Sequence, residues 1–265
     1  MRSLLQACHP LPTLAVTTLT TIFTVVSGRS ILGCALVAAA ALTGQLSVGW
    51  SNDAIDHARD RSAGRSDKPL ALNSALNPQT VWAAATAAAL LCVPLSFASG
   101  FTAGLVHICG VSAGWAYNLG LKATVFSWVP YAIGFASLPC FVMLGLPDAQ
   151  WPPWWITTAS ALLGCGAHLA NVLPDIDDDL AAGVRGLGQR LGHRRVLALI
   201  PVPLLAATAL LTLAGDGTYW AQISFGCAVL VSLGGVAFAG RFRRLPFLAA
   251  IIVASLNVVL LTRAM

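Results

Sequence analysis

The stretch ILGCALVAAAALTGQLSVGWSNDAIDHARD, residues 31–60, joins a long apolar run to a cluster of aspartates. The part before Asn52 carries no charged side chain and is long enough to cross a membrane as a helix. Asp53, Asp56 and Asp60 follow at once. The sequence therefore predicts a membrane helix that presents carboxylates at the membrane boundary.

The composition extends this prediction to the whole chain. Of its 265 residues, 57% are hydrophobic and 9% are charged, whereas a soluble domain carries about 25% charged residues. An ordinary soluble domain is excluded. We expect a single domain over residues 1–265, an all-α polytopic membrane protein with nine transmembrane helices around a central cavity, arranged as two four-helix halves plus a ninth helix. The predicted helices cover residues 11–27, 31–50, 79–98, 101–121, 127–146, 154–173, 195–214, 218–239 and 246–262.

The basic residues predict an orientation in the bilayer. If the N-terminus is cytoplasmic, 13 of the 15 Lys and Arg residues fall in loops on the cytoplasmic side, as the positive-inside rule requires. The aspartate clusters then face the cytoplasm too. Because the cations are spread over short loops between apolar segments, we expect no binding to nucleic acid. Nothing in the sequence indicates the oligomeric state.

A second acidic cluster repeats the pattern of the first. Both read NxxxDxxxD, and the residues are Asn52, Asp56, Asp60, Asn171, Asp175 and Asp179. Residues four apart share one face of a helix, so each triplet should lie along one side of its helix. The same offset of 119 residues carries Lys122 onto Arg241, which favours two similar halves whose acidic faces meet.

Converging carboxylates repel one another unless cations balance them. Oxygen ligands without an organised Cys or His set suit Mg²⁺, which binds one or two carboxylates together with substrate phosphate oxygens. The sequence therefore predicts Mg²⁺ and a diphosphate substrate. The Asp and Asn side chains of the two clusters offer such oxygen ligands.

Basic and aromatic residues near the clusters are further candidates. Arg65, Lys68, Lys122 and Arg185 are predicted to bind the diphosphate, although membrane orientation alone would also explain these cations. Trp50, Tyr117 and His168 are predicted to line the cavity. The competing interpretations are a tryptophan at the membrane interface and a histidine that only packs between helices.

These motifs resemble the UbiA superfamily of intramembrane prenyltransferases. Asn52-Asp53-xx-Asp56-xxx-Asp60 is similar to its first aspartate motif and Asp175-xxx-Asp179 to its second, and RSDKPL at 65–70 and Tyr117 with Lys122 resemble further family elements. The resemblance implies that the catalytic residues Asp56, Asp60, Asp175 and Asp179 carry two Mg²⁺ ions that hold an allylic diphosphate. Asn52, Asp53 and Asn171 are the assisting metal ligands that it implies. Asp177, Asp178 and the expected kink at Pro174 depart from the pattern.

The resemblance also implies a reaction. Pyrophosphate leaves with the help of Mg²⁺, and an allylic carbocation in an apolar chamber is captured by a lipophilic acceptor such as an aromatic compound. A terpene cyclase acting on the prenyl diphosphate itself is the alternative. A cation-coupled transporter is less favoured, because transport carboxylates tend to lie near the middle of the membrane and these lie at helix ends.

Overall fold

The computed structural model describes residues 2–62, 70, 76–214 and 218–264, and these residues are almost entirely helical. The long helices are α2 (Pro10–Val26), α3 (Ile31–Ser62), α5 (Pro78–Phe97), α6 (Phe101–Asn118), α7 (Val129–Leu144), α8 (Trp154–Val172), α11 (Pro201–Ala214), α12 (Tyr219–Ala237) and α13 (Leu245–Ala264). The shorter elements are α1 (Arg2–Ala7), the 3₁₀ turns η1 (Leu121–Ala123) and η2 (Leu173–Asp175), α9 (Ile176–Ala181) and α10 (Leu187–Leu199).

A helix lies over each of the nine predicted apolar segments, and the described residues form additional helices between them. One of these additional helices is α10, directly before residue 201. Gly192 adopts a φ of 77° inside α10, and Pro201 begins a new helix, α11. The predicted segment 195–214 therefore covers the end of α10 and all of α11, which meet at an angle of 46°, because Pro201 has no N–H with which to continue the helix. Gly192 lies before this segment and kinks α10 itself.

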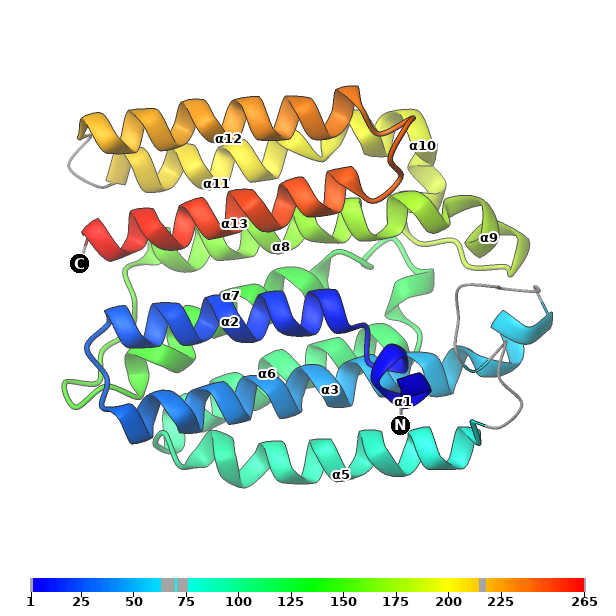
Figure 1. The fold of residues 1–265 in the computed structure, drawn as a ribbon, viewed down its shortest axis with the longest axis horizontal. Helices are drawn as coiled ribbons and strands as arrows, with labels where there is room; N and C mark the ends of the chain where they lie inside the picture. The colour runs from blue at the N-terminus through cyan, green and yellow to red at the C-terminus, as the bar shows by residue number, and fades with distance from the viewer. Residues whose placement is uncertain (1, 63–69, 71–75, 215–217, 265) are drawn as a thin grey trace.

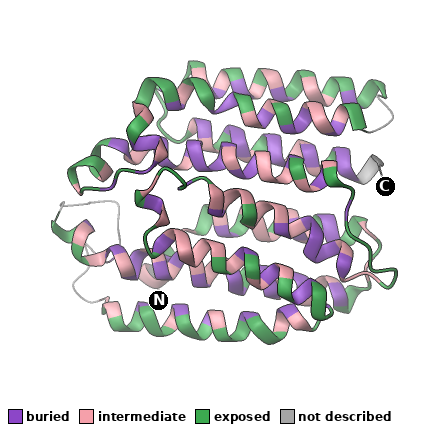
Figure 2. Ribbon diagram, turned by 180° about the vertical axis from the view of Figure 1, so that it is seen from behind, coloured by how far each residue is buried: buried purple, intermediate pink, exposed green. Residues whose placement is uncertain are grey.

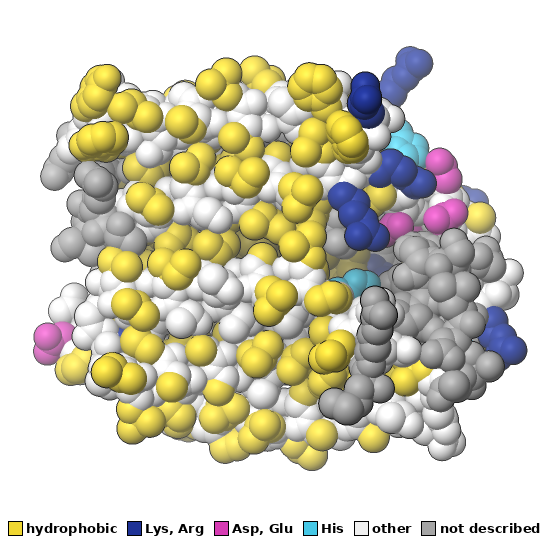
Figure 3. Space-filling view, in the orientation of Figure 1, with side chains coloured by type: hydrophobic (Ala, Val, Ile, Leu, Met, Phe, Trp, Pro, Cys, Tyr) yellow, Lys and Arg dark blue, Asp and Glu magenta, His cyan; other side chains and the backbone are white. Residues whose placement is uncertain are grey.

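Helix length and composition support membrane crossing for some of the nine predicted helices. By length and composition, four of the described helices could cross a membrane, or five if the bent pair α10 and α11 counts as one span. The long helices lie side by side, with α12 and α5 at opposite edges (Figure 1). Large hydrophobic side chains are exposed on several helices, for example Leu90, Phe101 and Leu230. Apolar side chains are spread over the whole length of the face in Figure 3, as expected of a surface that contacts lipid.

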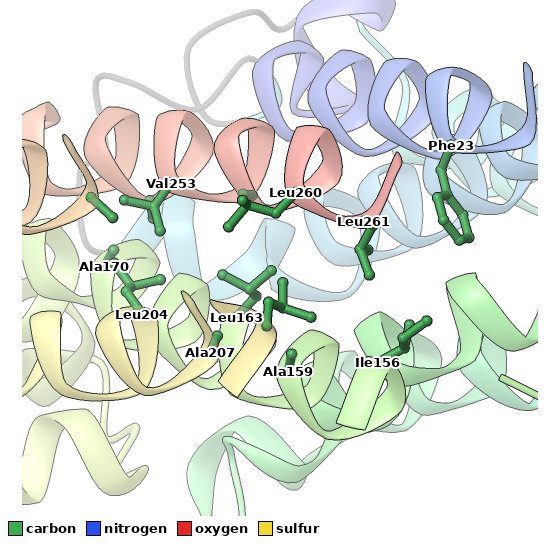
Figure 4. Packing of buried hydrophobic residues seen from close by; sticks show 14 of the residues in the cluster. Phe23, Ile156, Ala159, Leu163, Ala170, Leu204, Ala207, Val253, Leu260 and Leu261 are labelled. Carbon is green, nitrogen blue, oxygen red and sulfur yellow. The ribbon is translucent and has the colours of Figure 1, made fainter. Parts of the chain in front are cut away.

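The bundle holds together through close contacts between neighbouring helices. α3 packs against α5, α6 against α7, and α8 against α7, α11 and α13. Small residues make this possible: a Cβ added at Gly164 of α8 would lie 2.4 Å from the carbonyl oxygen of Tyr131 in α7. In Figure 4, side chains of α8 such as Ala159 and Leu163 fill the space between α11 and α13. Figure 2 shows buried residues concentrated on the inward sides of the helices.

Charged residues gather at one end of the bundle. Figure 3 shows Lys, Arg, Asp and His side chains at the end of the molecule where α9 and α10 lie, beside a hollow between α2 and α13. The C-terminal turns of α3 reach the same end (Figure 1). The fold thus brings two aspartate clusters that are far apart in the sequence to one end of one bundle.

Candidate functional site

The first aspartate cluster lies on the last turns of α3. Asp53, Asp56 and Asp60 are only 2%, 7% and 7% exposed, and α3 runs through them without a break. Their spacing puts all three carboxylates on the inward side of the helix. Buried carboxylates require cations or hydrogen-bond donors, because an uncompensated buried charge is very costly.

Basic groups meet Asp56 directly. The ammonium of Lys122 donates to both carboxylate oxygens of Asp56 at 2.5 Å, and the guanidinium of Arg59 lies 2.6 Å from one of them. Lys122 is buried although it comes from a short turn. That turn follows Gly120, whose φ of 149° favours glycine. The predicted diphosphate ligand Lys122 therefore lies beside the first aspartate cluster.

The polar neighbours of Asn52 include a residue that the sequence analysis missed. Asn52 donates to the Asn118 side-chain oxygen at 3.0 Å. Asn118, buried at the end of α6, donates in turn to the Val48 carbonyl and the Ser51 hydroxyl, each at 2.8 Å. Asn118 therefore fixes the orientation of Asn52. Its position one residue after Tyr117 was the only available signal.

His9 contacts Asp53, the first aspartate of this cluster in the sequence. Its Nε2 lies 3.1 Å from an oxygen of Asp53. His9 connects α1 to α2 and has a φ of 55°, which is uncommon for a residue other than glycine. The amino-terminal segment thus reaches across to the aspartate end of α3.

The second cluster is built differently. α8 ends at Val172, η2 contains Pro174, and α9 begins at Ile176, so Asn171, Asp175 and Asp179 do not share one continuous α-helix. The predicted α-helix is interrupted here by the 3₁₀ turn η2, because proline removes a backbone donor. The predicted interruption at Pro174 is confirmed.

Side chains from other elements also support the second cluster. Gln189 of α10, a buried residue that the sequence analysis missed, donates to Asp179 at 2.7 Å. Arg243, in the segment between α12 and α13, donates to the carbonyl oxygen of Pro174. The Nε2 of His193 lies 3.1 Å from Asp177, at the exposed edge of the site. The acids that depart from the family pattern are therefore on the outer side, and Asp177 is one of them.

Two tyrosines connect the clusters. Tyr117 is close enough to Asp56, Asp175 and Asp179 to interact electrostatically with all three. Its ring makes an edge contact with the ring of Tyr131, with centroids 5.3 Å apart. The Tyr131 hydroxyl accepts a hydrogen bond from Asn171 at 3.0 Å. Catalytic candidates from both halves of the sequence therefore lie within electrostatic range of Tyr117.

Other predicted residues lie elsewhere. His168 is fully buried against the rings of Tyr117 and Tyr131, and its Nε2 lies 3.1 Å from the Ser127 hydroxyl. Trp50 donates to the Leu4 carbonyl of α1. Neither His168 nor Trp50 is among the described residues that line the cavity.

Three more cations, Arg65, Lys68 and Arg185, were predicted to bind the diphosphate. Arg185 is exposed, and its carbonyl accepts a hydrogen bond from Arg190. Arg65 and Lys68 fall outside the described residues. Their predicted contacts with a diphosphate stay predictions.

A cavity of about 240 Å³ begins beside this polar end and extends between α2, α3, α6, α7, α8 and α13. Asn52, Tyr117 and Asn171 line its polar end. The rest is mostly apolar, with residues such as Val48, Phe135 and Leu163. No Lys, Arg, Asp or Glu is among the described lining residues. The shape suits a ligand with a charged head at the aspartates and an apolar body in the bundle.

The described residues contain no group of three His, Cys, Asp or Glu side chains close enough to hold one metal ion by themselves. Their donors near the cavity are instead carboxylate and amide oxygens, from Asp56 and Asn52 on one side and Asp175, Asp179 and Asn171 on the other. Such a set fits a hard cation that takes few ligands from the protein and completes its shell with water and substrate oxygens.

The family model that describes the UbiA prenyltransferase family matches residues 11–261. The chain belongs to this family. The match includes both aspartate clusters, both tyrosines and Lys122, so the family assignment and the geometry concern the same residues. No curated protein sequence matched the chain.

Solved structures share the UbiA fold with this chain at low sequence identity. A UbiA homolog from Aeropyrum pernix K1 has 19% identity and a TM-score of 0.76, with 94% of this chain and 96% of that chain covered. A UbiA homolog from Archaeoglobus fulgidus bound to GPP and Mg²⁺ has 16% identity and a TM-score of 0.73, with 97% of each chain covered. A digeranylgeranylglyceryl phosphate synthase has 17% identity and a TM-score of 0.67, with 99% of this chain and 96% of that chain covered.

Proposed function

We propose that this protein is a Mg²⁺-dependent intramembrane prenyltransferase that ionises an allylic isoprenoid diphosphate and transfers the prenyl group to a lipophilic acceptor. The observation that carries the proposal is the position of Tyr117, near aspartates of both clusters and on the wall of the cavity. Family membership and the relative bound to GPP and Mg²⁺ support the same chemistry.

The diphosphate would bind between the two aspartate clusters. Asp56, Asp60, Asp175 and Asp179, assisted by Asn52, Asp53 and Asn171, would hold Mg²⁺. The metal supplies charge that stabilises the departing pyrophosphate. Lys122 would place its ammonium beside the same oxygens, and Arg65, Lys68 and Arg185 would also bind the diphosphate.

Aromatic and apolar residues of the cavity would then stabilise the carbocation and shield it from water. The rings of Tyr117 and Tyr131 present electron-rich faces near the point of ionisation. The apolar cavity keeps water away from the cation until the acceptor reacts. We further propose nine crossings, with the N-terminus and the aspartates on the cytoplasmic side, because the basic residues concentrate there.

Purified protein with dimethylallyl, geranyl and farnesyl diphosphates tests the proposal. We expect Mg²⁺-dependent pyrophosphate release, abolished by EDTA, and a prenylated product when aromatic acceptors are added. No pyrophosphate release with any donor, from protein that remains folded, would contradict it. Cyclic hydrocarbons or terpene alcohols formed without acceptor would indicate the terpene cyclase instead.

A further inference from the structure

At the inner end of the cavity, away from the aspartates, lies His107 of α6, which is 3% exposed and lines the cavity. Its ring stacks on Phe141 with centroids 4.3 Å apart and an angle of 13° between the planes. Ten residues of α6 separate His107 from Tyr117, which corresponds to about 15 Å along the helix. His107 therefore plays no part in binding the diphosphate.

The hydrogen bonds of Ser96 determine which nitrogen of His107 carries the proton. The single hydroxyl proton of Ser96 is donated to the Cys92 carbonyl at 2.6 Å. The Nδ1 of His107 lies 2.7 Å from the same hydroxyl oxygen. Since the oxygen has no second proton, Nδ1 must be the donor. His107 is therefore held as the Nδ1–H tautomer, and its Nε2 is a hydrogen-bond acceptor.

This Nε2 has no hydrogen-bond partner among the described residues, and it is not one of the fully enclosed polar atoms. It therefore opens on the cavity. Gln45 of α3 lines the same cavity and also lacks a hydrogen-bond partner within the described part of the chain. Gln45 directly follows Gly44 on α3, where an added Cβ would lie 3.6 Å from the His107 ring, and both side chains border the same cavity.

A purely apolar ligand would leave both groups unsatisfied, and each unsatisfied buried polar group is destabilising. A carboxylate would be equally unsuitable, because no Lys or Arg is found among the described lining residues and a charge without a counter-charge is costly inside a membrane protein. A neutral hydroxyl satisfies Nε2 by donating to it. A hydroxyl or carbonyl oxygen can also accept from the Gln45 amide.

We propose that His107 and Gln45 form a neutral polar subsite that binds the hydroxyl group of an uncharged lipophilic acceptor. The inference rests on the proposed function, since an acceptor is required only if prenyl transfer occurs. Its hydroxyl lies at His107, and its reactive carbon extends toward Tyr117. His107 and Tyr117 are about 15 Å apart along α6, and the acceptor and the prenyl donor together must span this distance. The distance favours an elongated acceptor over a single ring.

Binding of three related probes tests this subsite: 2-naphthol, its methyl ether 2-methoxynaphthalene, and 2-naphthoate. Their affinities are measured by naphthalene fluorescence with the full-length protein in detergent. We expect 2-naphthol to bind about tenfold or more tightly than the ether, the effect of one well-placed hydrogen bond to a buried group. We expect 2-naphthoate to bind more weakly than 2-naphthol.

Two variants and a control test whether His107 and Gln45 cause the preference for 2-naphthol over its methyl ether. His107→Phe keeps the ring stack and should abolish the preference for 2-naphthol over the ether, and Gln45→Leu should reduce it. Ser137→Ala is the matched control, because the Ser137 hydroxyl also borders the cavity but is already donated to the Gly134 carbonyl. It should leave the preference unchanged. If His107→Phe does not fold, Gln45→Leu alone shows whether the preference depends on this subsite.

The inference is overturned if the native protein binds the ether or 2-naphthoate as tightly as 2-naphthol, or if the preference survives in the folded variants. Pyrophosphate release from geranyl diphosphate is measured on the same samples. If the native protein prefers 2-naphthol but releases no pyrophosphate, the proposed function is refuted and the polar subsite is still supported. Release without the preference would refute the subsite alone.

Discussion

At the scale of single residues, one aspartate of each cluster is held by a polar side chain from another element. Asp56 is buried and meets two cationic side chains, Lys122 and Arg59. Asp179 lies nearer the surface and accepts a hydrogen bond from the neutral amide of Gln189. Removing one partner of a buried ion pair leaves an uncompensated charge, which makes such pairs sensitive to mutation.

Lys122→Met tests the importance of the first ion pair. We expect kcat/KM for geranyl diphosphate to fall roughly 10- to 100-fold, the usual effect of losing a charged hydrogen bond. The loss should appear largely in KM if Lys122 also contacts the diphosphate. Steady-state kinetics and a thermal melt of the same sample measure these effects.

Arg194→Gln is the control for charge, because Arg194 is exposed on α10 and its substitution also removes one positive charge. Its kinetics should match those of the native protein. A Lys122→Met protein with a lower melting temperature and native kinetics would show that the ion pair serves only stability.

At the scale of elements, sequence reasoning succeeded where proline, glycine and apolar length determine a helix. The break at Pro174 and the start of α5 at Pro78 follow from such signals. It missed Asn118 and Gln189, because their partners lie on other helices and no local pattern specifies a contact across the bundle. It also treated the second aspartate triplet as part of one α-helix, although a 3₁₀ turn at the proline that it identified interrupts this helix.

Pro174→Ala tests whether the break after α8 positions the second cluster. Alanine restores a backbone donor, so α8 should continue toward α9 and rotate Asp175 and Asp179 relative to Asn171. We expect kcat/KM for the donor to fall about tenfold or more, with a melting temperature that is unchanged or higher, because an interior proline costs a helix about 3 kcal/mol.

Pro153→Ala, directly before α8 at its other end, is the matched control and should leave the kinetics unchanged. Native kinetics in Pro174→Ala would mean that the break does not place these carboxylates.

At the scale of the whole molecule, the cavity depends on how closely α6 and its neighbours approach. His107, Gly110, Gly114 and Tyr117 line it from one face of α6, and a Cβ at Gly110 would lie 2.1 Å from the Ser137 hydroxyl oxygen on α7. A Cβ at Gly114 would lie 2.8 Å from a methyl group of Val48 on α3, so a larger side chain there must displace α3 or fill the cavity.

Gly114→Leu should therefore shorten the longest prenyl chain that the protein accepts. We expect the ratio of kcat/KM for farnesyl diphosphate to that for geranyl diphosphate to fall about tenfold or more, since a few methylene groups in a closely fitting pocket already change binding by this amount. Gly226→Leu on α12 is the control, because nothing lies within 4 Å of a Cβ added there. An unchanged ratio in a folded Gly114→Leu protein would place the prenyl chain outside this cavity, and the substrate path would then have to follow another face of the bundle.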